Sequence, residues 1–346
     1  ERCNVELDMS ETIFPHFDTP DDMSHKDYLY QLCKAGLDER YKGKSSYDDA
    51  IERMNFELKV IGNMGFETYF LIVWDFMKEA KRLNVERAVR GSGAGSIVAY
   101  SLGISQLDPL ALDLLFERFL NPDRISLPDL DIDFGDKGAI IDYVRKKYGE
   151  DKVAMIGTFG TMKAKAVLKD VMRVFRIPFD EANAITKLVT EKTIQKSLNA
   201  RLRIENEDGT IKEGDLKDDA AKLQNFKRKH EKIFEVAERL EGCVRHKGVH
   251  ACGVVWGREG ISEYIPTYAK KGDVITQVEG GDVETYGLVK FDFLGVETLN
   301  VIKNVLNMIG KDGDWLENIT MDDDAVYEML REAKSIGVFQ VESEGM

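Results

Sequence analysis

Apolar residues recur at helical spacing in the first eighty residues of the chain and at strand spacing in several later segments. The early pattern predicts three helices, over residues 25–41, from residue 45 or 46 to about 61, and over residues 69–83. Asp22 or Ser24 can cap the first of them. The third carries apolar residues around most of its first turns, so we expect it to be buried.

Strand-like and helix-like runs alternate in the rest of the chain. The segment 127–134 alternates apolar and acidic residues, with the period of a strand. Further short strands are expected over residues 153–156, 253–256, 274–278 and 288–293, and further helices over residues 139–148, 161–175 and 298–309. Residues 177–242 are mostly helical and charged in pattern, with an exposed loop over residues 206–219. The layout predicts an α+β fold in which a helical insertion interrupts a mixed sheet.

Charge is distributed unevenly along the chain. The 346 residues have a net charge of −14, which taken alone argues against a nucleic-acid partner. Residues 163–247 nevertheless hold 20 Lys and Arg against 15 Asp and Glu, a net of +5. The remainder holds 28 against 47, a net of −19. The middle is therefore basic, and the acidic excess elsewhere can come from an acidic surface or from carboxylates that gather around cations.

The ends of the chain, its hydropathy and its cysteines indicate a broad class. The chain begins at Glu1 without a start methionine or a signal peptide and stops without a closing element, so we expect a piece of a longer protein. The apolar runs are shorter than the roughly eighteen residues that a membrane span needs. Four cysteines without a CxxC pair favour a reduced, cytoplasmic protein.

The acidic strand carries a pair of candidate metal ligands. Asp131 and Asp133 are two residues apart and share one face, whereas the apolar residues around them point into a core. Like charges side by side are costly unless a cation neutralises them, and Mg²⁺ binds carboxylate and phosphate oxygens. Alone, the pair also fits an exposed edge strand. Asp129, at the strand entry, is a weaker candidate ligand.

A glycine-rich segment upstream can bind phosphate. The residues that can contact an anion are Arg90, Gly91, Ser92, Gly93, Gly95 and Ser96. Glycines let backbone amides approach an anion, the helix that follows offers free N–H groups, and the serines and the arginine add donors. The segment is neither a Walker A loop nor a good dinucleotide fingerprint, and alone it also fits a plain tight turn.

A third carboxylate stands on a later strand. Asp292 lies between two phenylalanines, and a carboxylate on a buried strand needs a partner. A metal ion shared with Asp131 and Asp133 would supply one, as in two-metal phosphoryl transfer. Lys290 shares the face of Asp292 and can meet a phosphate.

Six ordered strings resemble the bacterial replicative polymerase III α subunits, the C family of DNA polymerases. They are RGSGAGS (90–96), ERFLNP (117–122), PDLDIDF (128–134), TFGTMKAKAV (158–167), HACGVV (250–255) and LVKFDFLG (288–295). The string GVFQVESEGM at residues 337–346 is similar to the start of the fingers region of that family. The resemblance covers essentially the whole chain.

The resemblance implies a polymerase β-like nucleotidyltransferase palm that carries an inserted helical thumb. Residues 1–162 and 248–297 match the palm, residues 163–247 the thumb and residues 298–346 the start of the fingers. Asp131, Asp133 and Asp292 match the catalytic aspartates, which bind two Mg²⁺ ions, and Mn²⁺ can substitute. The residues that match the grip on the incoming deoxynucleoside triphosphate are Ser92 with its neighbouring glycines, Arg118 and Lys290, and those expected to contact primer–template DNA are Lys163, Lys165, Lys169 and His250.

The implied activity is template-directed DNA synthesis, in which a primer 3′-hydroxyl attacks the α-phosphate of a deoxynucleoside triphosphate. The partners expected of the longer protein are a sliding clamp, a clamp loader and a proofreading exonuclease, in the cytoplasm with the bacterial nucleoid. The Gly-Pro-Gly-Arg that leads into the phosphate loop of the family reads Arg87-Ala88-Val89-Arg90 here, which predicts a less tightly turned entry. The finger arginines of the family are absent from these 346 residues, so we expect weak or no polymerisation by them alone.

Three alternatives remain open at this point. Cys243, His246, His250 and Cys252 are spaced C-x2-H-x3-H-x-C, which suits a zinc module, although the last spacing is tight for a tetrahedral site. A metal-dependent nuclease or phosphodiesterase would share the carboxylates but has no need of a triphosphate loop. The chain could also be a DNA-binding piece without activity.

Overall fold

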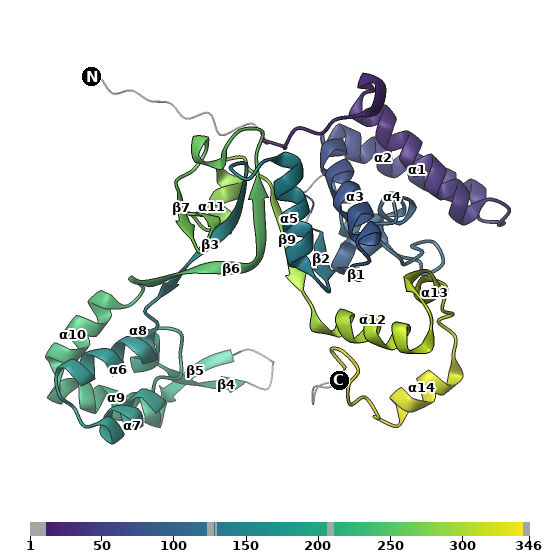
Figure 1. Ribbon diagram of the computed structural model, residues 1–346. Helices are drawn as coiled ribbons and strands as arrows, with labels where there is room; N and C mark the ends of the chain where they lie inside the picture. Colours follow the sequence, from purple (N-terminus) through teal and green to yellow (C-terminus); the bar gives the residue numbers. More distant parts are fainter. Residues whose placement is uncertain (1–11, 123–127, 129, 206–210, 342–346) are drawn as a thin grey trace, which may run out of the picture. The chain divides into compact units, whose positions relative to one another are not determined.

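The computed structural model describes residues 12–122, 128, 130–205 and 211–341 (Figure 1). The chain divides into two compact units, one formed by Glu1–Ile156 with Val249–Met346 and the other by Gly157–Gly248. The helical insertion expected over residues 163–247 lies within the second unit. Asp129 lies outside the described residues.

The α-helices of the first unit lie at its start, at its end and between its strands. They are α1 (His25–Tyr41), α2 (Tyr47–Asn63), α3 (Glu67–Arg82), α4 (Ile97–Ser101), α5 (Lys137–Tyr148), α11 (Gly280–Thr285), α12 (Glu297–Ile309), α13 (Gly313–Glu317) and α14 (Asp324–Arg331). The three predicted N-terminal helices are confirmed. Ser24 caps α1 by accepting from the N–H of Asp27 at 3.1 Å.

Among the described residues, no helix has the length and hydropathy of a membrane span.

The described residues also form a seven-stranded sheet in the order β1-β2-β9-β6-β3-β8-β7. The strands are β1 (Arg87–Arg90), β2 (Asp131–Phe134), β3 (Val153–Thr161), β6 (Val244–Trp256), β7 (Thr267–Lys270), β8 (Asp273–Thr276) and β9 (Lys290–Gly295). β2 is parallel to β9 and β3 to β8, whereas β1 is antiparallel to β2, β6 to β9 and β7 to β8. The predicted mixed sheet with flanking helices is therefore confirmed.

Edge strands β1 and β7 are not apparent in the sequence pattern. All four residues of β1 are half-buried and two of them are arginines, so this edge strand carries no apolar alternation. β3 and β6 are longer than the expected strands, because both continue into the second unit.

An aromatic cluster covers one face of β2, β9 and β6. The ring of Phe76 on α3 lies 6.3 Å from that of Phe134, 6.3 Å from Phe291 and 4.9 Å from Phe293, measured between centroids. Trp256 stacks on Phe291 at 4.0 Å. Because side chains alternate along a strand, residues 131, 133 and 292 project from the opposite face.

The second unit has its own core and mixes helices with a hairpin. Its elements are α6 (Ala164–Val174), α7 (Phe179–Lys187), α8 (Ile194–Leu198), β4 (Arg201–Glu205), β5 (Ile211–Leu216), α9 (Asp218–Lys229) and α10 (Glu231–Leu240). The expected loop over residues 206–219 is wrong beyond residue 210, because β5 pairs antiparallel with β4 and α9 begins at Asp218. Backbone pairing in a hairpin does not require an apolar pattern, so the polar composition concealed it.

We expect Phe76→Ala to lower the free energy of unfolding by about 3–5 kcal/mol, because it leaves a cavity among aromatic rings. Chemical denaturation followed by near-ultraviolet circular dichroism measures the change. Met308→Ala on α12 is the control: its side chain is 84% exposed, and the expected change is below about 0.5 kcal/mol. Equal losses in the two variants would contradict the central place of Phe76.

Candidate functional site

Asp131 and Asp292 lie side by side on two parallel strands. β2 and β9 pair so that Asp131 is opposite Asp292. Registered partners on neighbouring strands point to the same face, and Asp133 shares it because it lies two residues further along β2. Asp133 and Asp292 are 3% and 9% exposed, and Asp131 is half-buried. Strand register thus brings the three predicted aspartates to one face of the sheet.

Two cations neutralise two of these carboxylates. Arg90 on β1 is the register partner of Asp131, and its Nε donates to both carboxylate oxygens of Asp133 at 2.9 and 2.8 Å. Lys290 Nζ donates to Asp292 Oδ2 at 2.8 Å. The other oxygen, Asp292 Oδ1, is buried and has no hydrogen-bond partner.

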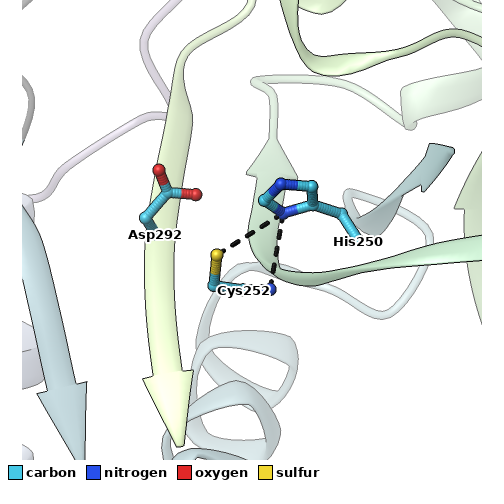
Figure 2. Close-up of side chains that lie close together, drawn as sticks. All are labelled: His250, Cys252 and Asp292. Atoms are coloured by element: carbon cyan, nitrogen blue, oxygen red, sulfur yellow. Dashed lines mark hydrogen bonds between the residues drawn. The ribbon is translucent and has the colours of Figure 1, made fainter. Parts of the chain in front are cut away.

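The three predicted aspartates are not the side chains whose ligand atoms lie closest together. Among the described residues, the group with ligand atoms all within 4.8 Å of one another consists of His250, Cys252 and Asp292 (Figure 2). Asp131 and Asp133 are outside this group. The three aspartates therefore share a face without their oxygens being drawn together, and a shared two-ion site stays a prediction.

Burial governs the protonation of the groups around this face. The pKa of the Asp133 carboxyl is raised above its usual value, chiefly by burial, although the Arg90 guanidinium lowers it and Asp131 raises it. Burial also raises the pKa of the Cys252 thiol, and the neighbouring Asp292 carboxylate raises it further. Both effects favour the protonated form of the Cys252 thiol.

The glycine-rich segment forms a 3-10 helix, η2 (Gly91–Gly95), and most of it is buried. Gly91 has φ of +75°, a conformation that favours glycine. A Cβ at Gly93 would come within 2.2 Å of the Leu130 side chain, and one at Gly95 within 2.7 Å of the Leu115 carbonyl oxygen. Packing therefore requires glycine at position 95 and disfavours a larger residue at position 93, and only Gly91 and Ser92 of the segment are exposed.

A buried carboxylate on α2 already occupies the amide groups at the start of α4. Glu57 is 0% exposed and accepts from Ser96 Oγ at 2.7 Å and from the N–H groups of Ile97 and Val98 at 3.1 Å. Arg53 Nε donates to Glu57 at 2.8 Å. This corrects the expectation for Ser96: its hydroxyl is buried and committed to Glu57, so it is not placed to bind a phosphate.

Arg53 and Glu57 together hold the glycine-rich segment in place. Arg53 Nη2 also donates to the carbonyl oxygens of Gly95 and Leu114, each at 3.3 Å. The prediction from sequence missed both residues. A signal was present, because Glu57 lies on the buried stripe of α2 with Ala50, Met54 and Ile61, where a charge needs a partner.

The other predicted contacts are spread over both units. Arg118 ends a short 3-10 helix, η3 (Phe116–Arg118), and is exposed. In the second unit Lys163, Lys165 and Lys169 are exposed at the start of α6 and along it, and Lys169 Nζ lies 4.8 Å from the centroid of the Phe179 ring.

His250 is half-buried. The residues around it are not those of the four-residue zinc module considered from the sequence. Its Nδ1 accepts from the N–H of Gly253 at 2.7 Å. The Cys243 thiol donates instead to the carbonyl oxygen of Arg239. The group that includes His250 and Cys252 contains neither Cys243 nor His246, and takes Asp292 as its third member.

Comparisons with known proteins agree along the whole chain. Residues 27–295 match the family "Bacterial DNA polymerase III alpha NTPase domain", and residues 298–346 match "Bacterial DNA polymerase III alpha subunit finger domain". Proteins named DNA polymerase III subunit alpha are similar to this chain. The one from Borreliella burgdorferi is 45% identical over 100% of the chain, and that from Bacillus subtilis 40% identical over 100%. The chain spans 30% of the length of each.

We expect Glu57→Gln to lower the free energy of unfolding by about 3–5 kcal/mol, because it leaves the Arg53 guanidinium without its buried carboxylate. Urea denaturation measures the loss. Glu79→Gln is the matched control: Glu79 pairs with Arg82, whose side chain is 68% exposed, and this change should cost about 1 kcal/mol or less. Similar losses in both variants would argue against the Arg53–Glu57 pair as an anchor.

Titration of Asp133 tests the charges around it. Arg90→Ala should raise the already raised pKa of Asp133 further, because the guanidinium favours the ionised carboxylate. Asp131→Asn should lower that pKa, because it removes a neighbouring negative charge. Carboxyl carbon chemical shifts followed against pH measure both changes. A change of the opposite sign in either variant would contradict the pairing.

Proposed function

The chain belongs to the bacterial DNA polymerase III alpha subunit family, and from this premise we propose that it provides the catalytic core of a DNA-directed DNA polymerase. In the proposed reaction, the primer 3′-hydroxyl attacks the α-phosphate of a deoxynucleoside triphosphate and pyrophosphate leaves. The observation that carries the proposal is the registered pair Asp131–Asp292, with Asp133 on the same face of the sheet. Since the chain spans 30% of the length of its relatives, the activity is proposed for a protein of their length.

The parts of the chain are assigned on the same premise. Residues 1–162 and 248–297 would form the palm, residues 163–247 the thumb and residues 298–346 the start of the fingers. The exposed lysines of α6 support the thumb assignment, because exposed cations can contact the phosphates of primer–template DNA without reading sequence.

Asp131, Asp133 and Asp292 are the residues that would hold Mg²⁺, with Mn²⁺ as a substitute. Their donors fit a hard divalent ion because all are carboxylate oxygens, and Asp292 Oδ1 is buried without a hydrogen-bond partner. When bound, two such ions supply a Lewis acid for the attacking hydroxyl and positive charge for the leaving pyrophosphate.

Arg90 and Lys290 pair with carboxylates in the absence of a nucleotide, and they would also contact its phosphates when it binds. Arg90 bonds Asp133 through Nε, and its guanidinium has further N–H groups that suit a phosphate. Lys290 pairs with Asp292 on the same face. Gly91 and Ser92, the exposed part of the glycine-rich segment, would add a backbone amide and a hydroxyl, and Arg118 a further charge. Gly93 and Gly95 are buried, so we expect them to contribute less to triphosphate binding than Gly91 and Ser92 do.

The wider partners follow from the family alone. We propose that the longer protein binds a sliding clamp, a clamp loader and a proofreading exonuclease. We also propose that it works in the cytoplasm, at the bacterial nucleoid. For the 346-residue chain by itself we expect at most weak polymerisation.

Asp131→Ala should reduce the rate of primer extension by at least about a thousandfold, because several kcal/mol of charge stabilisation are lost. DNA affinity should change little. The assay uses the protein at the length of its relatives and follows nucleotide incorporation and nucleotide release on one labelled primer. Asp142→Ala, an exposed aspartate on α5, is the control and should extend at the unsubstituted rate.

Two outcomes of this assay would overturn the proposal. If Asp131→Ala extended primers as fast as the unsubstituted protein, the aspartate would not be catalytic. If the unsubstituted protein released nucleotides and incorporated none, the site would be that of a nuclease.

A further inference from the structure

We propose that His250, Cys252 and Asp292 bind a soft divalent cation of the Zn²⁺ type, and that this ion inhibits the protein by taking Asp292 away from the Mg²⁺ site. The binding is a property of three side chains of the first unit and stands without the proposed function. The inhibition rests on the proposed function, because it requires Asp292 to hold a catalytic ion.

The distance between the two soft donors suits zinc. Cys252 Sγ lies 3.5 Å from His250 Nδ1. Tetrahedral Zn²⁺, with Zn–S of about 2.3 Å and Zn–N of about 2.0–2.1 Å, sets its sulfur and nitrogen ligands about 3.5 Å apart. Figure 2 shows the thiol, the imidazole and the carboxylate turned toward a common space.

Asp292 completes the set with a carboxylate oxygen that Lys290 does not bond. Lys290 bonds only Oδ2 of this carboxylate, while Oδ1 is buried without a hydrogen-bond partner. A buried carboxylate oxygen without a donor is costly, so it favours a cation that comes within reach.

Strand register lets the His250 ring approach Asp292. Gly253 on β6 is the register partner of Asp292 on β9, so no side chain of β6 stands over the carboxylate at that point. The His250 ring folds into the space instead, and a Cβ at position 253 would lie 2.9 Å from its Nδ1. The half-buried positions of His250 and Cys252 leave them within reach of solvent ions.

The donor chemistry separates this site from the magnesium site. Thiolate and imidazole suit Zn²⁺, whereas Mg²⁺ requires oxygen ligands. Binding replaces the Cys252 S–H bond with a metal–sulfur bond and releases the proton to solvent. To ligate through Nδ1, His250 would give up the hydrogen bonds that this atom accepts from the N–H groups of Cys252 and Gly253. Three protein donors leave a fourth position open to water or phosphate, as in other three-ligand zinc sites.

Cobalt spectroscopy tests the binding directly. Co²⁺ added to the metal-free protein should produce the intense near-ultraviolet band of a thiolate–cobalt bond, and Zn²⁺ should abolish it. Cys252→Ala should lack the band. Cys243→Ala, which changes an exposed cysteine outside the group, should keep it.

Asp292→Asn should weaken Co²⁺ binding by at least about tenfold, since even outer partners of metal ligands contribute 10–100-fold. Circular dichroism checks that each variant is folded, and Cys252→Ser replaces Cys252→Ala if the latter is not. The absence of a band, its persistence in the Cys252 variant, or its loss in Cys243→Ala would overturn the site.

Primer extension tests the inhibition separately, with Zn²⁺ titrated at fixed Mg²⁺ and each variant referred to its own rate without Zn²⁺. The half-inhibitory Zn²⁺ concentration should be at least about tenfold higher for Cys252→Ala and should rise with Mg²⁺. A cobalt band without zinc inhibition of an active enzyme would refute the sharing of Asp292. A cobalt band in a protein of the relatives' length that extends no primer would leave the site standing and refute the proposed function.

Discussion

The site depends on one constraint, the parallel register of β2 and β9. Side chains on a strand alternate between two faces, so the register that sets Asp131 beside Asp292 also turns Phe134 and Phe293 into the aromatic core. A slip of one residue would bury carboxylates among rings and expose phenylalanines, at a cost of many kcal/mol. The packing of Phe76 and its neighbours thus determines which face carries the acidic groups.

Placing three carboxylates on one face creates an electrostatic problem that the sheet resolves locally. Arg90, from the edge strand, and Lys290, from the strand of Asp292 itself, each neutralise one carboxylate. Neither satisfies Asp292 Oδ1, and the glycine opposite Asp292 leaves the space above it open to His250 and Cys252. Asp292 is therefore the residue shared by the two proposed sites, one made of carboxylates for a hard ion and one with His250 and Cys252 for a soft ion.

The local parts of this arrangement could be predicted from the sequence, because they depend on spacing along a single segment. The N-terminal helices with the Ser24 cap, and the common face of Asp131 and Asp133, belong to this kind. Long-range partners could not be predicted. Glu57 meets Ser96 only because α2 packs against α4, and Cys252 meets Asp292 only because β6 lies next to β9. Cysteine and histidine spacing raised a zinc module only as an alternative, and Asp292, which completes the group with His250 and Cys252, is forty residues away from Cys252 on another strand.

The role of Glu57 changes how this protein would recognise a phosphate. A glycine-rich segment followed by a helix is usually taken to offer backbone amides to an anion, yet here the chain supplies the anion itself. A buried carboxylate with Arg53 beside it fixes the segment before any ligand arrives, and it also lowers the positive potential at the start of α4. A triphosphate would therefore be held mainly by side-chain cations such as Arg90 and Lys290, which are the groups that also neutralise the aspartates. In the proposed site, nucleotide binding and metal binding would thus be coupled through these shared cations.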